Sequence, residues 1–309
     1  MSPRGPSGLQ NVITLGEQQA VITEVGATLR SYTVGGVDVV DPFGPDEVCA
    51  GSRGQPLIPW PNRLDGGRYR FAGVAHQVPI NDVAGGTAIH GLTNWAGWDR
   101  SQGTTSEVTL THTLYPKLGW DWIVDLAITY GLTADGLRVT TTATNRSADP
   151  CPFGAGFHPY FRPPSGRVED VVLELPADGY DVTDDRLIPT GHAPVDDTPW
   201  DFRKPRRIGD LAINLGFNTL RRDPDGVARF TARQPDTDWS VAVLFGPGWD
   251  WAVVYTGEML VKGRRESVAI EPMTGPANML QSGDNLLTLQ PGQSWEAWWS
   301  IHPGWGSLS

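Results

Sequence analysis

Cysteine is almost absent from this chain of 309 residues, which contains only Cys49 and Cys151. Two cysteines are too few for a disulfide framework or a cysteine-rich metal site. Long hydrophobic runs are absent as well, and without a run of about 20 apolar residues no membrane-spanning helix is predicted. Residues 1–10 lack the apolar segment of a signal peptide. Together these absences predict a cytoplasmic protein without a membrane partner.

Positive charge is also scarce, because 24 Lys and Arg stand against 35 Asp and Glu, for a formal net charge of −11. Nucleic acids and anionic membrane surfaces are bound through basic patches. A nucleic-acid partner is therefore not expected. The chain further lacks internal repeats, low-complexity tracts and any segment typical of a linker. We therefore expect one domain over residues 1–309.

Turn-forming residues, by contrast, are abundant. The 37 Gly and 26 Pro make up about a fifth of the chain, against a usual share of about 12%. Apolar and polar residues alternate along 108–116 and 122–130, as in half-buried strands. Residues 28–34 and 37–40 flank Gly35-Gly36 and predict a β-hairpin. No helix of ordinary length is predicted. The pattern favours an all-β fold, a large antiparallel β-sandwich.

The segment 156–162, Gly-Phe-His-Pro-Tyr-Phe-Arg, concentrates reactive and aromatic side chains near the middle of the chain. His158 precedes a proline, and a residue before proline favours extended backbone, so we expect it on a strand or at a strand end. An imidazole titrates near neutral pH and can serve as a general acid or base. A structural histidine within a sheet is the alternative, and residues elsewhere in the chain bear on the choice.

Three further motifs carry candidate functional residues. The proline-rich segment 55–64 forms a stiff loop that presents Asn62 and Arg63. His90 precedes a glycine in a loop followed by two tryptophans, which suggests a pocket lined by indole rings. Glu271 follows an apolar extended run and precedes a proline, so its carboxylate is expected in a polar site. Each residue also has a structural interpretation, such as a turn-stabilising arginine.

Taken in order, these motifs resemble the aldose 1-epimerase (mutarotase) family over nearly the whole chain. The motifs are Pro59-Trp60-Pro61-Asn62-Arg63, His90-Gly91, Gly156-Phe157-His158-Pro159-Tyr160-Phe161 and Glu271-Pro272. The resemblance implies a β-supersandwich and an enzyme that interconverts the anomers of a free aldohexose. It implies that Glu271 is the general base and His158 the general acid. The substrate-binding residues that it implies are Asn62, Arg63, His90, Tyr160 and Asn214.

One position departs from the family pattern. Many members carry an aspartate shortly before a phenylalanine as a ligand of sugar hydroxyls, whereas this chain has Asn214 before Phe217. Asparagine keeps a hydrogen-bond acceptor and adds donors, but it carries no charge. The departure therefore concerns sugar preference and leaves the acid–base pair unaffected.

Several other functions compete with this prediction. A hexose-6-phosphate epimerase would need a cluster of cations, for which Arg203, Lys204, Arg206 and Arg207 are candidates. A glycoside hydrolase would need two carboxylates about 5–10 Å apart, and only Glu271 is a clear candidate. His90, His158 and Glu271 could form a metal triad, although no His-x-His pair is present. A non-catalytic sugar-binding module on the same fold is the last alternative. Our prediction is an enzyme with a small-molecule sugar partner and neither a cofactor nor a metal.

Overall fold

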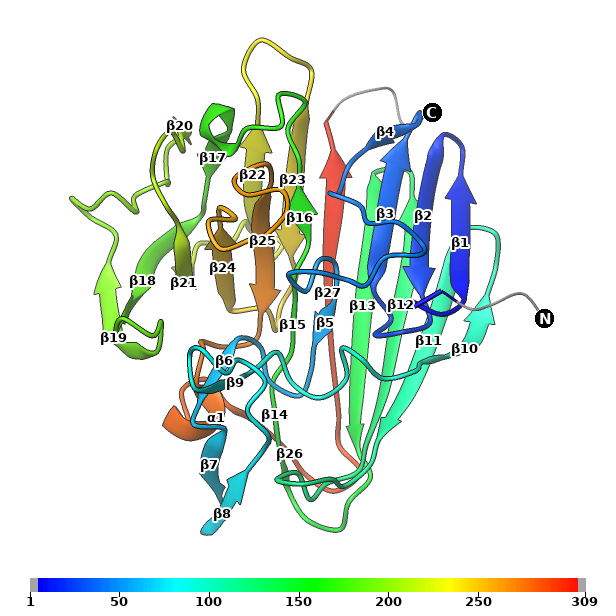
Figure 1. The fold of residues 1–309 in the computed structure, drawn as a ribbon, viewed down its shortest axis with the longest axis vertical. Coiled ribbons are helices and arrows are strands. Elements are labelled where there is room, and N and C mark those ends of the chain that lie inside the picture. The colour runs from blue at the N-terminus through cyan, green and yellow to red at the C-terminus, as the bar shows by residue number, and fades with distance from the viewer. Residues whose placement is uncertain (1–4, 305–309) are drawn as a thin grey trace.

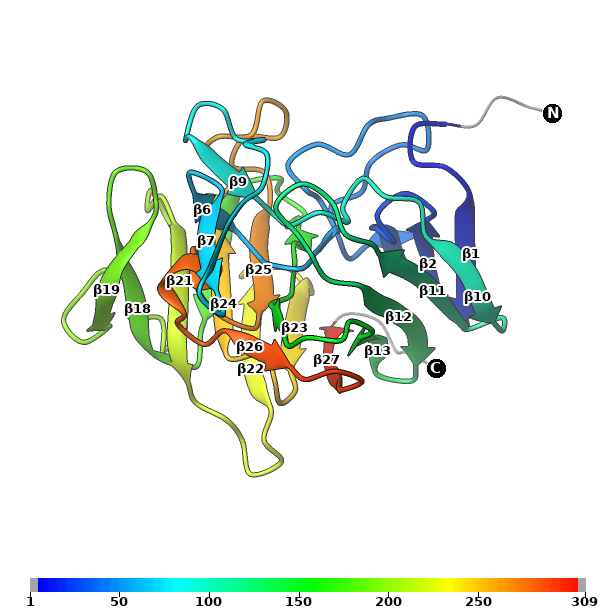
Figure 2. The same cartoon turned by 90° about the horizontal axis from the view of Figure 1, so that it is seen from below.

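The computed structural model describes residues 5–304, and nearly all of its regular structure is antiparallel strand. A nine-stranded sheet forms one layer of the molecule (Figures 1 and 2). Its strands, in spatial order, are β10 (Asp99–Gly103), β11 (Glu107–Leu114), β12 (Val124–Thr133), β13 (Gly136–Asn145), β27 (Ser294–Pro303), β23 (Ser240–Phe245), β22 (Ala228–Arg233), β17 (Val172–Glu174) and β20 (Arg206–Arg207).

Two smaller sheets cover this layer side by side, as Figure 2 shows from below. The four-stranded sheet contains β1 (Gln10–Leu15), β2 (Gln18–Thr23), β3 (Leu29–Val34) and β4 (Val37–Asp38). The eight-stranded sheet contains, in spatial order, β19 (Pro189–Pro194), β18 (Ala177–Thr183), β21 (Asn214–Leu220), β24 (Trp251–Tyr255), β25 (Val268–Met273), β15 (Gly156–Phe157) and β5 (Pro56–Leu57), with β16 (Tyr160–Phe161) also paired to β25.

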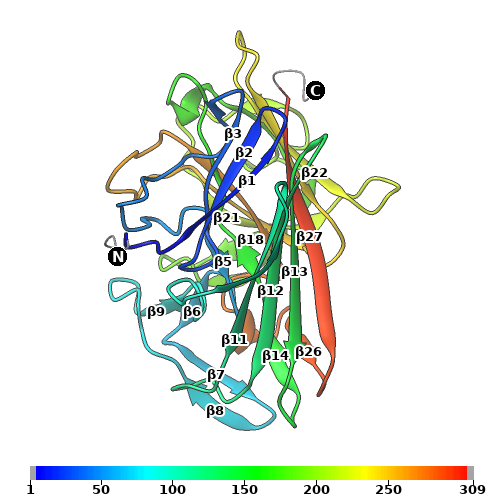
Figure 3. The same ribbon diagram turned by 90° about the vertical axis from the view of Figure 1, so that its right-hand side faces the viewer.

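Short ribbons gather at one end of the eight-stranded sheet, where Figures 1 and 3 show them projecting from the sandwich. They are β6 (Arg63–Asp65) with β9 (Thr87–Ile89), β7 (Arg68–Phe71) with β8 (Val74–Gln77), and β14 (Cys151–Phe153) with β26 (Leu287–Leu289). The helical elements among the described residues are one turn of 3₁₀-helix at Val168–Asp170 and α1 (Met279–Ser282). No helix in residues 5–304 has the length and apolar character that crossing a membrane requires.

The alternation read from the sequence places the core between the layers. Along β12 every second side chain is buried, from Val124 to Leu132, while the residues between them are partly exposed. Such a period of two is what one buried face of a sheet requires. The predicted hairpin also forms, with Val34 paired to Val37 across Gly35-Gly36. The all-β sandwich predicted from the sequence is therefore confirmed.

Candidate active site

Two dipeptides that end in proline, His158-Pro159 and Glu271-Pro272, lie opposite each other on neighbouring segments of the eight-stranded sheet. Gly156 pairs with Met273, and Tyr160 pairs with Ala269. The same register sets His158 opposite Glu271. Each of these two residues precedes a proline, and a proline has no N–H for the ladder, so the pairing stops here while the side chains stay on one face.

The backbone of His158 is instead fixed from its other side. Its N–H donates to the Gln55 carbonyl at 3.0 Å, and its carbonyl accepts from the Gly54 N–H at 2.8 Å. His158 therefore lies in the two-residue gap between β15 and β16, directly after the end of β15, which agrees with the predicted strand end. Glu271 was expected at the end of its strand, but β25 continues to Met273, so Glu271 lies within the strand. Pro159 falls in the gap between β15 and β16, whereas Pro272 lies within β25 and is paired with Ala252 of β24.

The two side chains meet inside the protein. His158 Nε2 lies 3.5 Å from Glu271 Oε1, and the two residues are 6% and 1% exposed. The imidazole stacks on the Tyr160 ring, with centroids 4.7 Å apart, and meets the His90 ring edge-to-face at 5.5 Å. No described residue hydrogen-bonds to Glu271 Oε2 or His90 Nδ1. Buried polar atoms normally have partners, so these atoms are suited to a polar ligand.

Burial acts on the two groups in opposite directions. It raises the pKa of the Glu271 carboxyl well above the usual value, and the positive charge of Arg63 only partly opposes the shift. Burial, together with His90 and Arg53, lowers the pKa of the His158 imidazole. Each environment thus disfavours the charged form. A pair of this kind holds a proton that either group can take, which is the property needed for proton transfer at two neighbouring atoms.

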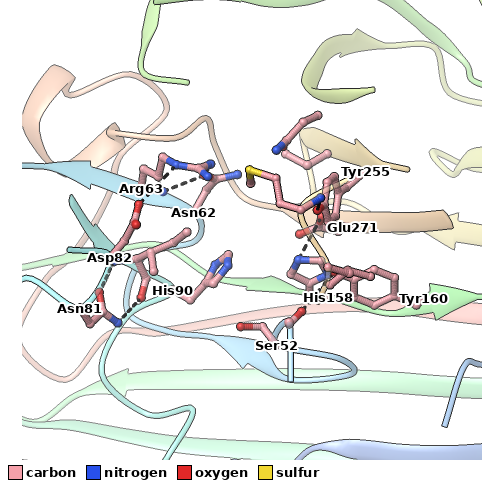
Figure 4. A pocket seen from close by; sticks show the side chains of 16 residues that line it. Ser52, Asn62, Arg63, Asn81, Asp82, His90, His158, Tyr160, Tyr255 and Glu271 are labelled. Atoms are coloured by element: carbon pink, nitrogen blue, oxygen red, sulfur yellow. Dashed lines mark hydrogen bonds and ion pairs between the residues drawn. The ribbon is translucent and has the colours of Figure 1, made fainter. Parts of the chain in front are cut away.

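The facing wall comes from the proline-rich loop and the His90 loop. Asn62 and His90 have positive φ values of 55° and 67°, and the His90 N–H donates to the Asn62 carbonyl at 3.0 Å. The Asn62 side-chain oxygen accepts from the backbone N–H of Arg63 at 2.8 Å and from its guanidinium at 3.2 Å. Arg63 Nε also lies 3.9 Å from Asp82. These contacts aim the guanidinium at the cavity (Figure 4).

Between the two walls lies a cavity of about 340 Å³, within the size range of small-molecule sites. All seven residues predicted from the sequence line it, namely Asn62, Arg63, His90, His158, Tyr160, Asn214 and Glu271. The structure therefore brings together side chains that lie up to 209 positions apart, since residue 271 is 209 positions after residue 62.

The predicted indole lining is wrong. No tryptophan is among the described residues that line the cavity, where the aromatic surface comes from Tyr160 and Tyr255. Trp98 is buried in the core, and Trp95 is 55% exposed elsewhere. Tyr255 and the loop residue Asp82 also line the cavity, although they were not predicted from the sequence. Tyr255 lies on the face of β24 that carries Val253, the register partner of Glu271, so strand alternation could have found it once the pairing was known.

Arg265, near Glu271 in the sequence, and Arg203, in the candidate cationic cluster, bind carboxylates outside the cavity. Arg265 lies six positions before Glu271 in the sequence, but it binds Glu169 at 2.9 Å and also Glu258. In the candidate cationic cluster, Arg203 binds Asp178, Asp196 and Asp201 at 2.7–3.1 Å. None of the four cluster residues lines the cavity. Among residues 5–304, no group of three or more His, Cys, Asp or Glu side chains is arranged to hold a metal ion.

Known proteins show the same combination of fold and sequence. The family model described as aldose 1-epimerase matches residues 11–302. The uncharacterized protein YihR of Escherichia coli K12 is 33% identical over 297 residues, which cover 96% of this chain and 94% of that protein. Mouse galactose mutarotase is 27% identical over 157 residues, covering 48% of this chain and 44% of that protein.

Solved structures agree with the fold. A putative aldose 1-epimerase from Escherichia coli K12 superposes with a TM-score of 0.83 at 20% identity, covering 96% of this chain and 99% of that one. An aldose epimerase homologue from C. elegans has a TM-score of 0.83 at 19% identity and covers 95% and 99% of the two chains. The family match across nearly the whole sequence settles the assignment. The chain belongs to the aldose 1-epimerase family.

Proposed function

We propose that the protein interconverts the α and β anomers of a free aldohexose. The observation that carries this proposal is the register of the strands, which sets Glu271 opposite His158 in a cavity with 3.5 Å between their nearest polar atoms. A sugar ring presents two neighbouring oxygens at its anomeric centre, the ring oxygen and the anomeric hydroxyl. An acid and a base at this spacing can serve both oxygens at once.

In the proposed reaction the proton shared by the pair lies on His158, so that Glu271 takes the proton from the anomeric hydroxyl while His158 gives its proton to the ring oxygen. The bond between C1 and the ring oxygen breaks, and C1 becomes the aldehyde of the open chain. Rotation about the C1–C2 bond presents the other face of the aldehyde. Ring closure then returns both protons with the roles reversed, so atoms and charges balance. Each group is expected to contribute about 10²–10⁴-fold, which is enough because anomers already interconvert slowly in water.

The remaining residues of the cavity hold the sugar. Arg63, Asn62 and Asn214 offer donors and acceptors to the hydroxyl groups. His90 approaches His158 from the opposite wall. Tyr160 is the proposed aromatic contact, and its stacking on the imidazole also limits how far that ring can turn.

The test compares variants of the pair with a variant of the binding wall. Glu271→Gln and His158→Asn should each lower kcat by about two or more orders of magnitude, because both act mainly in the transition state. Arg63→Ala should also raise KM, because it removes contacts that substrate and transition state share. Polarimetry of a freshly dissolved pure anomer measures all three. If wild type follows the uncatalysed drift while still binding sugar, the protein is a binding module and the proposal fails.

A further inference from the structure

A small recess extends the catalytic cavity away from Glu271. The two spaces share Asn62, Arg63, Asn214 and Val253 in their walls, and the recess holds about 20 Å³. A water molecule needs about 10–15 Å³ on such a measure. The recess therefore has room for one hydroxyl-sized group that projects from a ligand in the main cavity.

One row of residues across the eight-stranded sheet links the recess to the catalytic pair. Glu271 pairs with Val253, and Val253 pairs with Gly216. Tyr180 pairs with Phe217 in β18 and β21, so the next position sets Asp181 opposite Gly216. Neighbouring strands lie about 4.8 Å apart, which separates the backbones of Glu271 and Asp181 by about 14 Å. Paired residues share a face of the sheet, so the row forms a continuous floor with a carboxylate at each end.

The Asp181 carboxylate is held by one of its oxygens only. Its Oδ1 accepts hydrogen bonds from Trp251 Nε1 at 3.1 Å and from Asn218 Nδ2 at 2.9 Å, and lies 3.0 Å from His192 Nδ1. No described residue donates to Oδ2, although Asp181 is only 3% exposed and lines the recess. Three partners on one oxygen fix the carboxylate, and the other oxygen keeps its capacity to accept.

Gly216 makes room for this second oxygen. A Cβ atom at position 216 would lie 2.0 Å from Asp181 Oδ2, which is far inside contact distance. Gly216 does not have a positive φ, so its backbone does not require glycine. The missing side chain therefore serves the space that Asp181 Oδ2 occupies.

The β18–β19 hairpin contributes Thr183, Leu187 and Pro189 to the wall of the recess. An ion pair of 2.7 Å joins Arg186, in the turn of this hairpin, to Asp65 of β6. A space of about 20 Å³ admits a single substituent of a monosaccharide and leaves no room for a second sugar ring.

We propose that Asp181 determines sugar specificity, because its free Oδ2 accepts a hydrogen bond from one ring substituent of the bound aldose, either directly or through a single water. This inference rests on the proposed function. A site built to hydrogen-bond a hydroxyl rejects the analogue that lacks it, because a buried polar atom then loses its partner. The recess thus selects for a hydroxyl at one position of the sugar.

The experiment measures kcat/KM for glucose and galactose and for their 2-, 3-, 4- and 6-deoxy derivatives. For wild type we expect the loss of one particular hydroxyl to lower kcat/KM by about tenfold or more. In Asp181→Asn, whose three donors keep the remaining oxygen, the group facing the recess becomes an amide. The factor by which kcat/KM falls on loss of that one hydroxyl should then shrink by at least about threefold. The factors for the other hydroxyl positions should stay the same.

Two further variants separate a specific contact from a structural role. Asp284→Asn alters the other carboxylate that His192 contacts, at 2.7 Å, yet Asp284 does not line the recess, so its deoxy-sugar pattern should match wild type. Gly216→Ala should reduce the same position-specific penalty by displacing Asp181 Oδ2. An unchanged pattern in Asp181→Asn, even at a lower overall rate, would overturn the inference.

A binding measurement keeps this inference distinct from the proposed reaction. Calorimetric titration of the same sugars into Glu271→Gln, with and without Asp181→Asn, needs no turnover. A position-specific change in Kd supports the role of Asp181 even if wild type fails to interconvert anomers, which would refute only the reaction. Equal changes in Kd for every sugar, or the absence of binding by all of them, would overturn the role of Asp181.

Discussion

Glu271 is placed where an ionised carboxylate is costly. The raised pKa of the buried group means that folding favours its protonated form. The stabilising contribution of that form is fully present below the pKa of the unfolded state, at about 4.3, and is lost as the pH rises through the folded pKa. Glutamine does not titrate, so Glu271→Gln should be more stable than wild type, and the difference should grow from acid to neutral pH.

Thermal unfolding of both proteins over a range of pH measures this effect. Each kcal/mol corresponds to about 1.5 °C in Tm for a chain of 309 residues, because the entropy of unfolding is about 2.1 cal/mol/K per residue, so a difference that opens by a few degrees is resolvable. His158 titrates in both proteins, so its direct contribution largely cancels. Two parallel Tm curves would show that Glu271 keeps an ordinary pKa in the folded protein.

Arg63 should influence the pH dependence of the reaction through the same carboxyl. If the reaction needs one exchangeable proton in the Glu271–His158 pair, the acid limb of kcat/KM reports the second proton, taken up by His158. The alkaline limb reports loss of the last proton, held by the carboxyl. The Arg63 charge lowers the pKa of Glu271. Arg63→Met should therefore move the alkaline limb to higher pH, and Arg63→Lys, which keeps the charge, should move it less.

The acid limb is the internal control. The pKa of His158 is lowered by burial, by His90 and by Arg53, with no contribution from Arg63. Profiles of kcat/KM for the three proteins should therefore share their acid limbs. A displacement of both limbs by the same amount in Arg63→Met would contradict this assignment.

Some residues that line the cavity can be found from a sequence motif, whereas others can be found only from the pairing of neighbouring strands. Glu271 and His158 lie in short motifs that, taken in order along the chain, resemble the aldose 1-epimerase family, and that resemblance was sufficient to select them. Tyr255 and Asp181 lie in no motif, and only strand register brings them to the same face as Glu271. Tryptophan was misleading, because an indole suited to a sugar face is equally suited to a core.

The two loops that form the binding wall pack backbone against backbone. Gly91 has φ +75°, and a Cβ there would lie 2.1 Å from the Ile58 carbonyl oxygen, which accepts from the Leu92 N–H at 2.7 Å. Gly91→Ala should therefore push His90 and the proline-rich loop apart. We expect the free energy of unfolding to fall by more than about 2 kcal/mol and kcat/KM to fall with it.

Gly73→Ala provides the matched control for chemical denaturation. Gly73 has a similar φ of +83°, but a Cβ there would have no neighbour within 4 Å. The free energy of unfolding of Gly73→Ala should therefore fall only by the backbone strain, which is about 1–2 kcal/mol. Equal losses in the two variants would mean that the close approach of the loops contributes nothing.

Long strands were predictable, whereas the shortest were not. Alternation over eight or more residues identified β11 and β12, because one face of each is buried. The strands β5, β15 and β16 have two residues each, which is too short for any period to show. These short strands flank or support His158, so the sequence identified His158 as a candidate residue without identifying the strands that hold it.

One hydrophobic core cluster includes residues from all three large sheets, among them Ile22, Leu126 and Ile270. Such continuity supports the proposal that residues 1–309 form one domain, which limited proteolysis can test.

The net charge of −11 belongs to the molecule as a whole, and its electrostatic effect extends over distances of about 8–10 Å at ordinary ionic strength.

Charge should also decide between free sugars and their 6-phosphates. Among the described residues that line the cavity, Arg63 is the sole Lys or Arg, and it faces the acidic Asp82 as well as Glu271. A phosphate dianion needs several donors and cations around it, and Arg203, in the candidate cationic cluster, is already paired with aspartates. We therefore expect kcat/KM to be at least about tenfold higher for glucose than for glucose 6-phosphate.

Ionic strength shows whether repulsion causes that preference. Added salt screens long-range charge, so it should raise kcat/KM for the phosphate while leaving the value for the neutral sugar nearly unchanged. Arg203→Gln should alter neither value, because Arg203 does not line the cavity. A clear preference for glucose 6-phosphate that disappears in Arg203→Gln would instead bring the cluster into the binding site, and the net charge would no longer explain which sugars the protein accepts.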